Sequence, residues 1–199
     1  MTTTAAASRP APGNGKQPAR ALHTFVAYVE DKPGVLARVA SLFRRRAYNI
    51  DSLTVGRTDV PGVSRMTIVM EADATTARLV EANLYKLVNV LRVEDVTYEP
   101  TVTRDLALIK VRADASSRAQ VLQIVEVFRA RVVDVAPEAL IVEITGTEDK
   151  LQGLVDVLRP FGIIEMVRTG SVAMTRGADA IPVDPTFVHA RVPTNGNGE

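Results

Sequence analysis

The chain has 199 residues, of which 46% are hydrophobic and 24% are charged, a composition typical of a folded globular protein. Lysine and arginine number 24 against 23 aspartate and glutamate residues, so no strong positive field attracts nucleic acid or an anionic membrane. The absence of cysteine excludes disulfides, thiolate metal sites and cysteine nucleophiles, and the only histidines, His23 and His189, do not suggest a metal cluster.

The amino-terminal stretch "MTTTAAASRPAPGNGKQPAR", residues 1–20, is rich in Ala, Thr, Pro and Gly and has no acidic residue. Such a composition is compatible with an organelle transit segment, but Arg is scarce and no amphipathic period is present, so a disordered arm is favoured. No apolar run reaches the roughly 18 residues that span a bilayer. We therefore expect a cytoplasmic protein without a membrane partner.

The first predicted element is a β-strand over residues 22–30, which is apolar on both faces and is therefore expected at the centre of a sheet. Residues 34–46 follow as an amphipathic helix, with Pro33 suited to its first turn and the arginines 44–46 complementing the dipole of its last turn. The apolar face expected for this helix comprises Leu36, Val39, Ala40, Phe43 and Ala47.

Two further strands are predicted over residues 48–57 and 63–71, joined by a turn that contains Pro-Gly. Asp73 is placed to cap a second helix, and a strand over residues 90–99 closes the unit. The apolar face of that second helix comprises Ala77, Val80, Leu84 and Leu87. The order of elements is βαββαβ.

The same order recurs in the second half of the chain. A strand over residues 104–113 precedes a helix in which Ser117 and Gln120 have the spacing of a capping box, and residues 131–145 read as two strands around a proline turn. The apolar residues of this helix are Val121, Ile124, Val125 and Phe128.

Thr147 then opens a helix that Pro160 ends, and residues 162–174 return as one strand. The apolar face of this last helix comprises Leu151, Leu154, Val155 and Leu158. The sequence thus predicts an α+β fold of two tandem ferredoxin-like βαββαβ domains, residues 21–99 and 100–177. A flexible tail is expected over residues 178–199, where prolines, Gly and Asn gather. Domains this small bury little core each, so a homo-oligomer is expected.

Candidates for general acid and base catalysis are carboxylates alone, and none is paired with a histidine, a metal-ligand spacing or a nucleophile in a sharp turn. They are Asp31, Asp51, Asp59, Glu71 and Glu94. We therefore predict no catalytic and no metal-binding residues, with His23 as a packing or edge residue. RNA-binding domains share the βαββαβ order, but their basic, aromatic ribonucleoprotein motif is missing here.

The step "DKPGVL" suggests instead a binding site at a helix start. Backbone N–H groups at Gly34, Val35 and Leu36 lack intrahelical acceptors and favour a small carboxylate, such as that of a free amino acid. Its ammonium would need oxygen acceptors such as Asp31 or Asn49. The apolar wall for its side chain is expected from Val35, Leu36 or Ile50. Because Pro-Gly before a helix is a weak signal, the spacing alone favours an ordinary helix cap over a ligand site.

Two longer stretches, "VEDKPGVLARVASLFRRRAYNIDSLTVGRTDVPGVSRMTIVM" and "LYKLVNVLRVEDV", resemble the amino-terminal ACT domain of the small regulatory subunits of acetolactate synthase, also called acetohydroxyacid synthase. Residues 103–176, with "FRARVVDVAPEALIVEITGTEDKL" and "GIIEMVRTGSVAMTRG", resemble the carboxy-terminal, ACT-like domain of the same subunits. The resemblance covers nearly all of the chain between the two expected tails.

This resemblance implies a chain without catalysis of its own. It implies binding to the large catalytic subunit, which holds thiamine diphosphate, magnesium and FAD. It also implies stimulation of that subunit and feedback inhibition by a branched-chain amino acid, with valine expected first and isoleucine or leucine as the other candidates. No cofactor is expected on this chain. A free-standing ACT-domain sensor with another partner is the alternative, although a helix-turn-helix and a basic stripe are missing.

The resemblance also implies that the effector lies between the ACT domains of a homodimer, with its carboxylate at the helix that Gly34 opens and Asn49 facing it from the partner chain. The predicted effector-binding residues are Asp31, Pro33, Gly34, Val35, Leu36, Asn49 and Ile50. The position of Asp31 is often Asn in this family. A carboxylate there attracts the ammonium of the ligand but repels its carboxylate, which affects both affinity and pH dependence.

Overall fold

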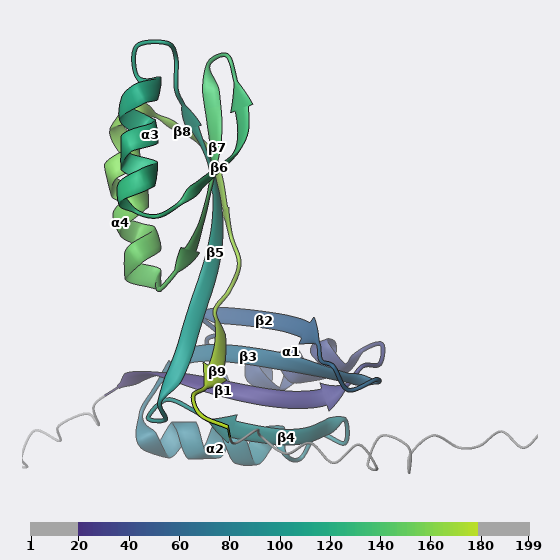
Figure 1. Ribbon diagram of the computed structural model, residues 1–199. Helices are drawn as coiled ribbons and strands as arrows, with labels where there is room; N and C mark the ends of the chain where they lie inside the picture. Colours follow the sequence, from purple (N-terminus) through teal and green to yellow (C-terminus); the bar gives the residue numbers. More distant parts are fainter. Residues whose placement is uncertain (1–19, 179–199) are drawn as a thin grey trace, which may run out of the picture.

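The computed structural model describes residues 20–178 and shows two α+β units in sequence (Figure 1). The first unit comprises β1 (Ala21–Glu30), α1 (Val35–Arg45), β2 (Ser52–Arg57), β3 (Val63–Ala72), α2 (Ala74–Leu84) and β4 (Val90–Asp95). The second comprises β5 (Thr101–Arg112), α3 (Arg118–Val127), β6 (Arg131–Ala136), β7 (Ala139–Gly146), α4 (Glu148–Leu158), the 3-10 helix η1 (Arg159–Phe161), β8 (Ile163–Arg168) and β9 (Val172–Thr175).

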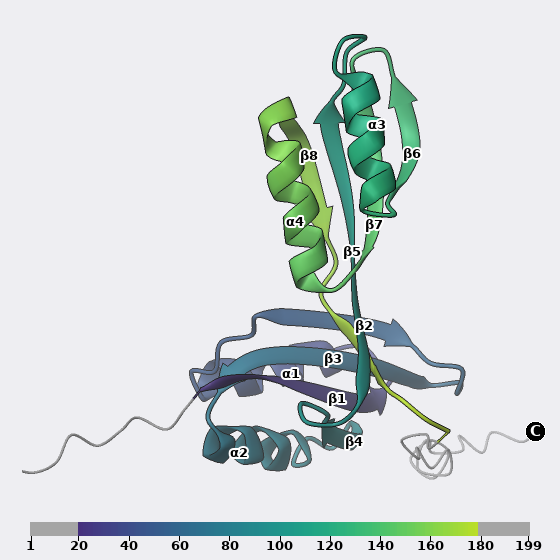
Figure 2. The same ribbon diagram turned by 60° about the vertical axis from the view of Figure 1, so that its left-hand side comes forward.

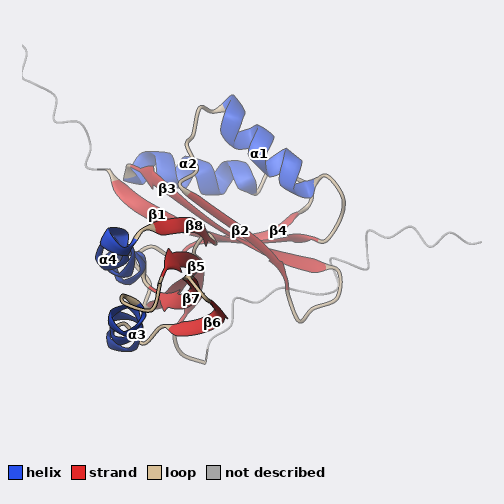
Figure 3. Cartoon of the chain, turned by 90° about the horizontal axis from the view of Figure 1, so that it is seen from above, coloured by secondary structure: helices blue, strands red, loops and turns tan. Residues whose placement is uncertain are grey.

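Both units have the strand order of a ferredoxin-like sheet. The first sheet runs β2-β3-β1-β4 and the second runs β6-β7-β5-β8, with every neighbouring pair antiparallel. The predicted α+β fold with two tandem βαββαβ units is confirmed, and β1 occupies the predicted central position. Each pair of helices covers one face of its own sheet (Figure 3).

Each unit has its own hydrophobic core between its sheet and its two helices. The predicted faces of the second and fourth helices are confirmed, since Ala77, Val80 and Leu84, and then Leu151, Leu154, Val155 and Leu158, are buried. Leu87 packs against the first core from the segment that follows α2. Hydrophobic burial at period 3.6 therefore holds both helix layers in place.

The predicted core face of α1 is confirmed for Val39 and Phe43 and wrong for Leu36, Ala40 and Ala47, which are exposed. The buried residues are Val35, Val39, Leu42 and Phe43, at the i, i+4, i+7 and i+8 spacing of a single stripe. Leu36 is 44% exposed, and Ala47 lies beyond the helix with a φ of 55°. The helix begins one residue later than predicted, and Pro33 lies before its N-cap, Gly34, rather than in its first turn.

Other predicted boundaries need correction as well. The strand expected from residue 48 begins at Ser52, because Tyr48 and Ile50 turn toward the core of the first unit. Asp73 caps α2 as predicted and accepts hydrogen bonds from the N–H groups of Thr75 and Thr76. No capping box forms at α3, since the Ser117 side chain does not cap it.

The strand predicted over residues 162–174 is two strands. Its first half, β8, pairs with residues 107–111 of β5, and its second half, β9, pairs with residues 101–104 near the start of β5. The long strand β5 thus spans both units, and β9 runs down beside it onto the first sheet (Figures 1 and 2). There Ala173 is buried with Val26 and Val96 on the sheet face that carries no helix.

The break between β8 and β9 is where the two units touch. Ser171 accepts a hydrogen bond at its carbonyl from the Thr54 hydroxyl, 2.8 Å away, and donates its N–H to the Ser52 hydroxyl, also at 2.8 Å. A Cβ atom on Gly170 would lie 2.5 Å from Ser52 Oγ and 3.1 Å from the Leu53 carbonyl oxygen. Glycine is therefore required for this close approach.

The expected arm, residues 1–20, and the expected tail, residues 178–199, lie outside the described residues except for Arg20 and Ala178. Within residues 20–178, no helix is long and apolar enough to cross a membrane. The division at residues 99 and 100 remains our proposal for the domain boundary, and β9 shows that the two units nevertheless share a buried contact.

Candidate effector site

The start of α1 is an exposed helix end without a side-chain cap. Its N-cap, Gly34, has φ +83° and ψ −5°, a left-handed conformation that glycine adopts readily and other residues adopt at a cost. A Cβ atom at Gly34 would meet nothing within 4 Å, so the space beside it is open. The first turn of α1 contains no acidic residue. This helix start is thus open to a ligand.

Most of the backbone N–H groups at this start have no acceptor. Val35 donates weakly to the Lys32 carbonyl at 3.4 Å, and Arg38 begins the helical pattern by donating to the Gly34 carbonyl at 3.1 Å. For Gly34, Leu36 and Ala37, the described part of the chain supplies no hydrogen-bond acceptor. Free N–H groups together with the positive end of the helix dipole favour a small anion such as a carboxylate.

A cation that the sequence analysis did not predict lies beside this start. Arg57, at the end of β2, holds its Nε atom 3.0 Å from Oδ2 of Asp31. The pairing of β1 with β3 and of β3 with β2 explains the contact, since Glu30 lies opposite Val63 and Arg57 lies opposite Ser64. The carboxylate of Asp31 is therefore partly neutralised, which weakens its expected repulsion of a ligand carboxylate.

The loop before α1 is fixed by a second polar group that the sequence analysis missed. Glu30 is only 3% exposed, accepts a hydrogen bond from the Asn89 side-chain amide and lies 3.2 Å from the Lys32 ammonium. Asn89 in turn accepts a hydrogen bond from Arg38 of α1 at 2.6 Å. A charged residue at the end of an apolar strand was the signal available in the sequence for such a group.

Asn49 lies at the other end of α1. Its side-chain amide donates to Asp51 at 2.9 Å, and the second oxygen of Asp51 accepts the N–H of Glu71. Eleven residues of α1 separate Gly34 from the loop that carries Asn49, a length of about 16 Å. One chain therefore does not bring these two predicted site residues together.

The remaining predicted site residues differ in exposure. Pro33 and Leu36 are exposed and border the open start of α1, whereas Val35 is buried in the core and Ile50 packs against that core. Leu36 is therefore the aliphatic residue of the predicted set that one chain presents to a ligand at Gly34. Val35 contributes chiefly to the packing that holds α1 on the sheet.

His23 has the structural role that the sequence analysis favoured. It is 2% exposed, and its Nδ1 lies 2.8 Å from a carboxylate oxygen of Asp95 and 3.3 Å from the Thr97 hydroxyl. Among residues 20–178, no three His, Cys, Asp or Glu side chains form a group that could hold a metal ion.

Both units of the chain match known protein families. Residues 25–92 match the family model described as "AHAS small subunit-like ACT domain", and residues 104–177 match the one described as "Small subunit of acetolactate synthase". Over 159 residues the chain is 52% identical to the acetolactate synthase small subunit of Mycobacterium bovis, covering 80% of this chain and 95% of the relative. The chain belongs to the family of acetolactate synthase small subunits.

Two further relatives support this assignment. The probable acetolactate synthase small subunit of Archaeoglobus fulgidus is 49% identical over 155 residues, which cover 78% of this chain and 97% of the relative. The crystal structure of the small subunit from Thermotoga maritima is 41% identical, with a TM-score of 0.75, over 80% of this chain and 99% of that one. Family membership makes this chain the small, regulatory subunit of acetolactate synthase and not the catalytic one.

Proposed function

We propose that this chain binds valine at the open start of α1 and thereby places the catalytic subunit of acetolactate synthase under feedback control. The observation that carries the proposal is the uncapped helix end at Gly34, with open space on one side and free N–H groups at Gly34, Leu36 and Ala37. These groups suit the carboxylate of a free amino acid. Isoleucine and leucine differ from valine by one methylene, worth about 1–3 kcal/mol, so they bind with a different affinity without being excluded.

The acting form is a homodimer of the first units. Valine is far too short to span α1, whose length of roughly 16 Å separates Gly34 from the loop that carries Asn49 in one chain. In a two-fold symmetric pair, the same two patches meet reciprocally, so Asn49 and Ile50 of one copy can face Gly34 of the other. The strand β2 is an edge of the first sheet and carries the 44% exposed Val55, which makes it a suitable dimer contact.

The charges near Gly34 suit both ends of the ligand. The free N–H groups and Arg57 attract the carboxylate, while the Asp31 carboxylate and the Asn49 side-chain oxygen can accept from the ammonium. The exposed face of Leu36 offers apolar contact for the isopropyl group. The family name implies a catalytic-subunit partner, and the proposal adds which residues of this chain hold each part of the effector.

The test is the rate of acetolactate formation by the catalytic subunit loaded with thiamine diphosphate, magnesium and FAD. We expect the rate to rise as this chain is added and to fall again as valine is added. Calorimetry should give a dissociation constant between about 1 mM and 1 μM for a ligand of valine's size. Absence of heat and of thermal stabilisation with valine, isoleucine and leucine would reject the site.

Sedimentation of the pure chain tests the dimer. A stable monomer at micromolar concentration, with and without valine, would contradict the arrangement in which Asn49 reaches Gly34 of another copy. The placement of the cofactors on the catalytic subunit stays a prediction from the family resemblance, and the cytoplasmic location of this chain stays a prediction from its sequence.

A further inference from the structure

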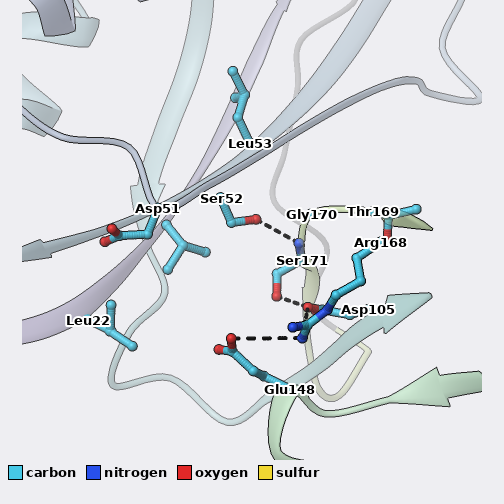
Figure 4. Close-up of a pocket in the computed structure, with 11 residues that line it drawn as sticks. Leu22, Asp51, Ser52, Leu53, Asp105, Glu148, Arg168, Thr169, Gly170 and Ser171 are labelled. Carbon is cyan, nitrogen blue, oxygen red and sulfur yellow. Dashed lines mark hydrogen bonds and ion pairs between the residues drawn. The ribbon is translucent and has the colours of Figure 1, made fainter. Parts of the chain in front are cut away.

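A pocket of about 390 Å³ lies at the junction of the two units, away from the start of α1 (Figure 4). The first unit lines it with Leu22, Val69 and Asp51, and the second lines it with Asp105, Glu148 and Arg168. Its volume falls in the range of about 300–1,000 Å³ that is usual for small-molecule sites. The contact of Ser171 with Ser52 forms part of its wall.

Arg168 is the cation of this pocket, and its donors are not satisfied. The side chain is only 24% exposed, and its Nη2 lies 3.8 Å from Glu148 and 3.9 Å from Asp105. Both distances exceed the hydrogen-bonding range of about 3.2 Å for N–H donors. The described residues give this guanidinium ion pairs only, so its planar fork is available to a carboxylate.

The pocket also has an excess of negative charge. Asp51, Asp105 and Glu148 outnumber Arg168, so a ligand that carries only negative charge is repelled. Asp105 is occupied by the Ser171 hydroxyl, whereas Glu148 is 71% exposed at the first turn of α4. In Figure 4, Leu22 and Asp51 lie on the opposite side of the pocket from Glu148 and Arg168.

From these features we propose that the junction pocket is a second amino-acid site, which takes a small ammonium–carboxylate zwitterion. The ligand carboxylate binds the Arg168 guanidinium, the ammonium binds the exposed Glu148 carboxylate, and the aliphatic part contacts Leu22 and Val69. A zwitterion satisfies both the free donors of Arg168 and the excess of carboxylates, which neither a plain amine nor a plain acid does.

The position of Asp51 connects this pocket to the proposed effector site. Asp51 lines the pocket, and its carboxylate, which points away from Glu148 and Arg168 in Figure 4, accepts the hydrogen bond that orients Asn49. A ligand in the pocket therefore contacts the residue that holds Asn49, and occupation of the junction is coupled to the first site through Asp51. The junction site itself rests on Arg168 and the pocket and does not require that the start of α1 binds valine.

Calorimetry of the full-length chain carrying Gly34→Asp, which blocks the start of α1, tests the proposal with L-valine as probe. We expect about one valine per chain. Arg168→Gln in the same background should weaken binding at least tenfold, and Glu148→Gln should weaken it by a smaller factor. Arg131→Gln, which removes another strand arginine that is ion-paired with Glu143, should leave binding unchanged.

Two half-ligands test the charge assignment. Isobutylamine is valine without its carboxylate and isovalerate is valine without its ammonium, and each should bind at least tenfold more weakly than valine. Equal binding of isobutylamine would show an amine site and overturn the proposal. Absence of valine binding to folded Gly34→Asp protein, or binding that neither Arg168→Gln nor Glu148→Gln weakens, would also overturn it.

Different results would reject the two proposed sites. If Gly34→Asp abolishes all valine binding, the junction proposal is rejected and the effector site at α1 stands. If Gly34→Asp changes nothing and Arg168→Gln abolishes binding, the effector site is rejected and the junction site stands. Circular dichroism of each variant establishes that it is folded, and Glu148→Gln serves as the independent variant should Arg168→Gln not fold.

Discussion

The first helices of the two units, α1 and α3, occupy the same place in the same fold but begin in different ways. At α3, a single oxygen of Asp114 accepts hydrogen bonds from the N–H groups of Ser116 and Ser117, at 3.0 and 2.8 Å, and from both hydroxyls. These hydrogen bonds, first that of the Ser116 hydroxyl, hold the pKa of Asp114 well below its usual range. At α1, Gly34 offers no such group.

The comparison shows that an open helix start is not a requirement of this fold. The helix α2 is also capped by an aspartate, Asp73, whose pKa is lowered chiefly by the hydrogen bond from the Thr76 N–H. The chain therefore caps α2 and α3 with carboxylates and leaves α1 bare beside open space. A bare start lowers the stability of the isolated unit, and a carboxylate ligand restores the missing interaction.

The largest expected effect is on valine inhibition. It comes from placing at the start of α1 a carboxylate like the one that caps α3. Gly34→Asp places a carboxylate where the ligand carboxylate is expected, so valine inhibition should be lost while the chain still stimulates the catalytic subunit. The left-handed backbone costs about 1–2 kcal/mol for a non-glycine residue, and a carboxylate at a helix start offsets about 0.3–1 kcal/mol of that. The measurement is acetolactate formation, titrated first with the variant and then with valine.

Gly177→Asp is the matched control for this variant, because Gly177 also has positive φ, +100°, and open space around it but lies in the second unit. It should retain valine inhibition. If Gly34→Asp also retains inhibition, the start of α1 is no more than a helix end. If stimulation disappears together with inhibition, the two functions share one surface and the comparison of helix starts does not separate them.

The next largest expected effect is on the free energy of unfolding and concerns the contact between the two units. Gly170→Ala adds a Cβ that clashes with Ser52 and with the Leu53 backbone, so we expect about 1–3 kcal/mol of destabilisation, as for overpacked sites. The same change at Gly153, inside α4 at an ordinary 3.4 Å from Phe128, should stabilise by about 0.5–1 kcal/mol. Urea unfolding of both variants gives the two values. Equal effects would show that the junction is not tightly packed.

The fold was largely predictable because its signals are local. Alternating apolar residues at period 2 and stripes at period 3.6 place β1, β3, α2 and α4, and the recurrence of βαββαβ fixes both sheets. The rotation of α1 was missed because Leu36 and Ala40, four residues apart, form a second apolar row beside the buried one. Which row is buried depends on how the helix packs against the sheet, and the spacing of apolar residues alone does not decide this.

The site was predictable only where the signal was local. Gly34 and its open N–H groups follow from Pro-Gly before a helix, but Arg57 reaches Asp31 through the register of three strands. The cap of α3 was assigned to Ser117 because its spacing to Gln120 fits a capping box, whereas Asp114 caps the turn before it by accepting from the N–H groups of Ser116 and Ser117. The splitting of the last strand depends on the packing of Gly170 against β2.

A smaller effect is expected from the cation near the open start. Arg57→Gln leaves Asp31 without its partner, so repulsion of the ligand carboxylate should weaken valine binding by about fivefold or less, the usual limit for an exposed pair. Asp31→Asn added to this variant should restore the affinity. Calorimetry of the single and double variants measures both steps. An affinity that Arg57→Gln does not change would show that Asp31 lies too far from the ligand carboxylate to matter.

The smallest expected effect on valine inhibition comes from the converse of Gly34→Asp. This change removes the carboxylate cap of α3, so that its start resembles that of α1. Asp114→Ala removes the acceptor of four hydrogen bonds, so the Tm at pH 7 should fall while valine inhibition stays unchanged.

The pKa of Asp114 is lower in the folded chain than its ordinary value of 3.8, so the contribution of this carboxylate to stability is complete above that pH. The Tm difference between wild type and variant should therefore shrink as the pH falls below 3.8 toward the lowered pKa. Thermal unfolding followed by circular dichroism from pH 7 to pH 3 measures this difference, and a difference that stays constant across the range would show that the carboxylate charge does not cap α3. Loss of valine inhibition in Asp114→Ala would instead mean that the second unit's helix start, and not only that of α1, takes part in effector binding.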